Sequence, residues 1–60
     1  MTDDALGRLR HDLRTPLALV IGFAELLATE RPLSDEQRRD LSAVVLSAAF
    51  EMRALIDAVK

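Results

Sequence analysis

The chain has no cysteine, tryptophan, tyrosine or asparagine, and it holds only two residues each of glycine, proline and phenylalanine. Without cysteine, neither a disulfide framework nor a thiolate metal site can stabilise the fold. The single histidine, His11, supplies too few soft ligands for a metal ion, so we expect no metal. The formal net charge of −2 argues against binding to nucleic acid. Packing of apolar side chains is therefore left as the main source of stability.

No hydrophobic run in the sequence is long enough to cross a bilayer. The longest apolar stretch extends from Pro16 to Ala24 and is followed at once by Glu25, whereas a transmembrane helix needs about 20 apolar residues. The acidic first four residues also lack the basic flank of a secretory signal. We therefore expect a cytoplasmic domain without a membrane segment. A parent protein could still be anchored in a membrane through another part of its chain.

Half of the residues are apolar, and the first apolar pattern predicts a helix from about residue 2 to residue 29. Residues that recur at steps of three and four lie on one side of a helix. The residues in this pattern are Leu6, Leu9, Leu13, Leu17, Val20, Ala24 and Leu27. Other apolar side chains widen the stripe on both sides. Such a broad face suits a helix that contacts two or more neighbours in a bundle.

The second apolar pattern predicts a helix from about residue 35 to residue 60, after a loop at about 30–34 that contains Pro32. Ser34 followed three residues later by Gln37 is the signature of a capping box at a helix start. The apolar residues then alternate steps of four and three, as in a coiled-coil seam. This seam consists of Leu41, Val45, Ala48, Met52, Leu55 and Val59.

Two long helices joined by a short loop form an antiparallel hairpin, here one domain over residues 1–60. A chain of this length buries too little surface to be comfortably stable alone. The broad apolar faces also exceed what two helices can cover. We therefore predict an all-α fold in which two antiparallel helical hairpins form a homodimer, a four-helix bundle.

The segment His11-Asp12-Leu13-Arg14-Thr15-Pro16-Leu17 lies inside the first predicted helix. Pro16 lacks the N–H that would bond the Asp12 carbonyl, and its ring crowds that carbonyl. We expect the helix to be loosened or kinked beside His11. Helical periodicity places the histidine opposite the apolar stripe, so we expect an exposed imidazole.

This segment resembles the H-box of sensor histidine kinases, in which a histidine is followed by an acidic residue, Leu, Arg, Thr and Pro. The match continues through Leu17, Gly22, Glu25, Leu26 and Leu27, and the whole chain resembles the HisKA-type dimerisation and histidine-phosphotransfer domain. The resemblance implies a fragment of a protein-histidine kinase, a transferase of two-component signal transduction. It also implies that His11 accepts a phosphoryl group and passes it to a response-regulator aspartate.

Two neighbours of His11 carry expected roles. A carboxylate beside an imidazole can hold a ring proton, as in catalytic triads, and the resemblance implies that Asp12 is the general base in phosphorylation. The other reading of Asp12 is a solvated helix aspartate. The resemblance associates Thr15 with phosphatase activity toward the partner; alternatively, Thr15 is only the residue that precedes Pro16.

Arg14, Ala18 and Gly22 are the candidate partner-binding residues. A basic side chain near the histidine attracts a phosphoryl group or an acidic partner, and small residues on an exposed helix face permit close approach. The resemblance implies that the strip beside His11 receives the receiver domain of a response regulator. A solvated charged face and ordinary surface variation are the alternatives.

No glycine-rich segment is present that would cradle nucleotide phosphates, so we expect no cofactor in this fragment. The resemblance implies that ATP and magnesium are bound by a separate catalytic domain, through an asparagine that this chain lacks. The isolated chain should then be unable to phosphorylate itself. Two other readings remain open: a non-catalytic dimerisation hairpin that retains the motif, and a stand-alone phosphotransfer protein.

Overall fold

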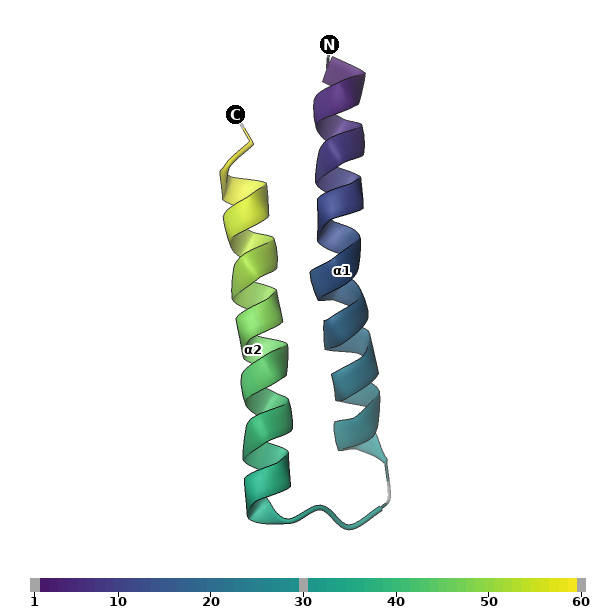
Figure 1. Ribbon diagram of the computed structural model, residues 1–60, viewed down its shortest axis with the longest axis vertical. Helices are drawn as coiled ribbons and strands as arrows, with labels where there is room; N and C mark the ends of the chain where they lie inside the picture. The colour runs from purple at the N-terminus through teal and green to yellow at the C-terminus, as the bar shows by residue number, and fades with distance from the viewer. Residues whose placement is uncertain (1, 30, 60) are drawn as a thin grey trace.

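A computed structural model describes residues 2–29 and 31–59 of the chain, and they form two antiparallel helices (Figure 1). Helix α1 extends over Thr2–Ala28 and helix α2 over Asp35–Asp57. The start of α1 and the end of α2 lie at one end of the hairpin, and the end of α1 and the start of α2 lie at the other. The predicted all-α antiparallel hairpin is therefore confirmed. Helix α2 ends earlier than the expected residue 60.

The start of α2 is fixed by the predicted capping box. The Ser34 hydroxyl accepts a hydrogen bond from the Gln37 backbone N–H at 3.0 Å, and the Ser34 N–H donates to Gln37 Oε1 at 2.9 Å. Asp35 and Glu36 add negative charge to the first turn, where the helix dipole favours it. The connecting segment therefore delivers the chain into α2 at a defined residue.

The α2 seam is the predicted one over most of its length. Ala48 is fully buried, and the other seam residues within the helix are half-buried: Leu41, Val45, Met52 and Leu55. Val59 was expected to continue the seam, but it remains 44% exposed. The reason is that α2 ends at Asp57, so Val59 no longer follows the helical period.

The α1 seam differs from the prediction at three positions. Leu6, Leu17 and Ala24 are exposed. The residues that face α2 instead alternate steps of four and three: Leu9, Leu13, Pro16, Val20, Phe23 and Leu27. Two packed helices contact through a narrow stripe with a mean spacing of 3.5 residues. The broad apolar face of α1 contains more than one such stripe, and α2 covers only one of them.

Pro16 occupies the centre of the α1 seam, and its side chain is less than 2% exposed. The helix continues through this residue without interruption from Thr2 to Ala28. Because a proline nitrogen carries no hydrogen, the Asp12 carbonyl lacks its usual intrahelical donor. The missing bond lies one residue from His11 along the chain.

The hairpin is a thin rod of 49 × 16 × 10 Å rather than a sphere. Its radius of gyration is 14.4 Å, whereas a compact domain of the same length would have about 10 Å. Among the residues whose burial the structure describes, only Pro16 and Ala48 are buried. A single hairpin therefore has an interhelical seam but little core.

Candidate functional site

His11 lies in the first half of α1 and is exposed. Thr15, Ala18 and Gly22 are exposed as well, and their spacing places them on the same helix face as His11. The structure thus brings together on one face the phosphoacceptor candidate and three of the residues singled out beside it. The imidazole is accessible to a partner without any opening of the hairpin.

Asp12 belongs to a different part of the surface. It lines a cleft of about 370 Å³ between the first half of α1 and the end of α2, together with Ala5, Arg8, Leu9, Leu55, Ala58 and Val59. Adjacent helix residues do not face each other, because they lie about 100° apart around the axis. Asp12 therefore lies on the cleft side of His11 along the surface of α1.

Sequence reasoning missed the far wall of this cleft. Leu55 and Val59 were identified as seam residues of the second helix, with no link to the histidine. The antiparallel arrangement brings the end of α2 beside the start of α1 (Figure 1). The one signal in the sequence was the spacing of the two apolar seams. Aligning these seams antiparallel places the end of the second helix beside the start of the first.

The basic residues near His11 are distributed around α1. Arg8 lines the cleft with Asp12, whereas Arg10 and Arg14 are exposed on other sides of the helix. Exposed basic side chains raise the local concentration of anionic ligands and partners. Three arginines lie within one helical turn of His11, together with the carboxylate of Asp12.

The strip at Ala18 and Gly22 is open. A Cβ atom built on Gly22 would meet no heavy atom within 4 Å. The glycine is thus not required by packing inside the hairpin. A second molecule can approach the α1 backbone closely at this point.

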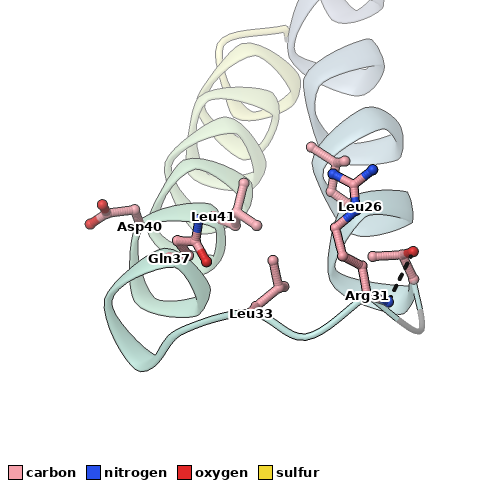
Figure 2. Close-up of a pocket in the computed structure, with 7 residues that line it drawn as sticks. Leu26, Arg31, Leu33, Gln37, Asp40 and Leu41 are labelled. Atoms are coloured by element: carbon pink, nitrogen blue, oxygen red, sulfur yellow. Dashed lines mark hydrogen bonds between the residues drawn. The ribbon is translucent and has the colours of Figure 1, made fainter.

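A second cleft of about 340 Å³ lies at the closed end of the hairpin (Figure 2). Leu33 of the connecting segment points toward Leu41 of α2, with Leu26 of α1 across the opening. The Arg31 N–H bonds Thr29 Oγ1 at 3.4 Å at the edge of this cleft. Leu26 lies fifteen positions after His11 in α1, about 22 Å along a helix axis, so this cleft is remote from the histidine.

A third groove of about 270 Å³ lies between the other two, lined by Leu19, Ala43, Val44, Ser47, Ala48 and Glu51. Helical periodicity places the residues that line all three clefts on one side of the hairpin. It places Leu6, Leu17 and Ile56 on the other side, where they are 50%, 42% and 52% exposed. The hairpin therefore has one side with clefts and one continuous apolar side.

Neither helix, over the described residues, is long and apolar enough to span a membrane. The same residues contain no group of three or more histidine, cysteine, aspartate or glutamate side chains that is arranged to hold a metal ion.

The chain matches one protein family over residues 2–59, the His Kinase A (phospho-acceptor) domain. This match covers nearly the whole chain and agrees with the helical hairpin and with the exposed histidine. The chain belongs to this family of phosphoacceptor domains, and the resemblance noted from the segment at His11 is confirmed.

The curated relatives include a sensor protein and cell-division control histidine kinases. The chain is 41% identical over 54 residues to the sensor protein VanSC of Enterococcus gallinarum, and this alignment covers 90% of the chain. It is 35% identical over 54 residues to the cell-division control histidine kinase PdhS of Brucella ovis and of Brucella suis, with 87% of the chain covered.

The chain spans only a small part of these relatives, 15% of VanSC and 5% of PdhS. The similarity therefore concerns one domain of much longer proteins. No solved structure matches the chain significantly.

Proposed function

We propose that His11 accepts a phosphoryl group from ATP bound by a separate domain and passes it to an aspartate of a response-regulator receiver domain. The observation that supports this proposal is the exposure of the single histidine on an unbroken helix of a phosphoacceptor family. The chain contributes the acceptor and its surroundings. The nucleotide and its magnesium ion belong to the separate domain.

The transfer is a nucleophilic displacement at the γ-phosphorus of ATP. An imidazole nitrogen with a free lone pair forms the N–P bond while the bond to the bridging oxygen breaks, and ADP leaves. The other ring nitrogen carries a proton that must depart when the ring becomes a neutral phosphoramidate. Asp12 receives this proton as the general base, because its carboxylate flanks the histidine on the cleft side.

The cleft beside Asp12 is where the ATP-binding domain docks in this proposal. Its walls include the apolar side chains of Leu9, Leu55 and Val59, and its rim includes Arg8. A domain that covers this cleft presents its nucleotide beside His11 and excludes water from the carboxylate. The docking and the proton transfer then take place at adjacent points of one surface.

The receiver domain is proposed to bind over the open strip at Ala18 and Gly22, with Arg14 at its edge. No side chain obstructs approach to Gly22, and His11 lies on the same face. A receiver aspartate placed here reaches the phosphohistidine directly. Thr15, between the histidine and this strip, orients a water molecule when the domain acts as a phosphatase.

The functional unit is proposed to be a homodimer, a four-helix bundle. A compact monomer of 6.6 kDa exposes about 3,900 Å², whereas this hairpin exposes 5084 Å². The excess is about 1,200 Å² per chain, and two chains that cover it bury about 2,400 Å², within the range of obligate homodimers. The side with Leu6, Leu17 and Ile56 forms the interface, which leaves the three clefts free.

The experiment that tests this proposal supplies a matching ATP-binding domain in trans and follows incorporation of labelled phosphate. The wild-type chain should be labelled, and His11→Gln should abolish labelling while the helical content and the association state stay unchanged. Thr15→Ala, the matched control on the same face, should be labelled at a nearly normal rate. It should affect only dephosphorylation of the receiver domain.

The two alternatives predict different results in this assay. A non-catalytic hairpin would remain unlabelled with every ATP-binding domain tested. A stand-alone phosphotransfer protein would instead take its phosphate from a phosphorylated receiver domain and not from the ATP-binding domain.

A further inference from the structure

The face of α2 that points away from α1 carries a second stripe at heptad spacing. Its residues follow steps of four, three, four, three and four: Arg39, Ala43, Leu46, Phe50, Arg53 and Asp57. All six are exposed, and Ala43 lies at the edge of this face, where it also lines the third groove. They lie about 160° around the helix from the seam that contacts α1. We call these six residues the outer stripe.

The centre of the outer stripe is apolar and ordered. Leu46 is 55% exposed and Phe50 is 49% exposed. The guanidinium carbon of Arg53 lies 4.9 Å from the centroid of the Phe50 ring, a cation–π contact that holds the ring against the helix surface. Helix α1 covers the opposite face of α2, so the hairpin itself does not cover this centre.

The stripe is complementary to itself. Its sequence of steps reads the same in both directions, so two copies of α2 can run antiparallel with every stripe residue opposite another. If the two-fold axis passes midway between Leu46 and Phe50, Leu46 meets Phe50 of the second copy and Ala43 meets Arg53. Arg39 meets Asp57 at both ends of the contact. A two-fold interface requires such reciprocal pairing.

Each of these pairs is chemically favourable. Leu46 and Phe50 bury apolar surface against each other. The small Ala43 side chain leaves room for the stacked Arg53 and Phe50. The two symmetric pairs of Arg39 with Asp57 join opposite charges, whereas a parallel arrangement of the same stripe would place like charges side by side. The charges therefore select the antiparallel arrangement.

We propose that the outer stripe is a second self-association surface, through which α2 of one hairpin pairs with α2 of another copy of the chain. This contact goes beyond the proposed phosphotransfer and does not involve His11. It also uses a different face from the proposed bundle interface at Leu6, Leu17 and Ile56. Each bundle dimer carries two outer stripes, one on each chain, so dimers joined in this way form tetramers and then longer assemblies. The contact is small, so it belongs among weak, transient interfaces.

The test is a charge exchange within the 60-residue chain, measured by sedimentation from about 10 µM to about 1 mM, the range that resolves weak association. The wild-type chain should associate beyond the dimer. Arg39→Glu and Asp57→Arg should each weaken this association about tenfold, because each places like charges opposite each other twice. The double variant should restore it to the wild-type level. An equimolar mixture of the two single variants should also associate, since their charges are complementary.

Both substituted positions are exposed, so the variants should keep the wild-type helical content and thermal midpoint. These two measurements are the control that shows whether a variant has lost its fold. If Arg39→Glu instead converts a dimer to a monomer and the double variant restores the dimer, the outer stripe is the main interface and the bundle proposal fails. The outer-stripe proposal is overturned if the wild type forms only a dimer at all concentrations and Arg39→Glu does not weaken that dimer. It is equally overturned if the double variant associates as weakly as the single variants.

Discussion

Replacing Pro16 by alanine should stabilise the hairpin, although the proline ring is less than 2% exposed. The substitution restores the N–H that the Asp12 carbonyl lacks and removes the clash of the ring with that carbonyl. It also removes part of a side chain from the centre of the α1 seam. The sign of the change therefore depends on which of these two effects is larger.

The magnitudes favour the backbone effect. Proline is less favourable than alanine by about 3 kcal/mol in a helix interior. The change to alanine removes two buried ring carbons, at about 0.8 kcal/mol for each buried methylene. The net gain in the free energy of unfolding is then about 1.4 kcal/mol. For a domain of this size, 1 kcal/mol corresponds to about 4–8 °C in the thermal midpoint.

Thermal unfolding followed by circular dichroism measures this gain at a fixed chain concentration. Pro32→Ala is the matched control, because Pro32 is exposed in the connecting segment and outside both helices. This control should lower stability slightly, by about 0.4–1 kcal/mol, since it only frees the unfolded chain. An unchanged or lower midpoint for Pro16→Ala would show that ring packing in the seam outweighs the missing hydrogen bond.

Three further predictions concern the interface, the cap and the base. Leu17→Asp should dissociate the proposed dimer in a sedimentation experiment, because it places an unpaired charge in the interface. Leu19→Asp should leave the dimer intact, because Leu19 is similarly exposed but lies on the cleft side. Equal effects of the two substitutions would contradict the proposed dimer face. Ser34→Ala should cost about 1 kcal/mol in unfolding experiments through loss of the cap, and an unaltered midpoint would show that the cap is dispensable. Asp12→Asn should slow phosphorylation of His11 by about 10²-fold, and a normal rate in a quenched-flow assay would remove Asp12 as the base.

The sequence predicted α2 better than α1 for a physical reason. Ser34 and Gln37 form a local capping box, and the α2 seam has only one run of alternating steps, so local spacing was sufficient. The apolar face of α1 is broader, and spacing alone does not decide whether Leu17 or Pro16 faces the neighbouring helix. Only packing against α2 selects Pro16, which sequence reasoning had treated as a distortion.

The candidate site was predictable in part. The position of His11 on an exposed helix face follows from the helical period, and the segment around it identified the family. The cleft beside Asp12 was not predictable, because it depends on which part of α2 lies next to α1. That alignment is set by the length of the connecting segment and by the packing of both seams. The spacing of residues within either helix does not fix it.

We propose that the imidazole of His11 is the phosphorylated group of this chain. The most direct measurement is site mapping by tandem mass spectrometry, after labelling with an ATP-binding domain and with the sample kept at neutral to basic pH. We expect one phosphoryl group per chain, on His11, as an acid-labile and base-stable phosphoramidate. Phosphate found on Thr15 or another hydroxyl residue, or label that persists in His11→Gln, would contradict it.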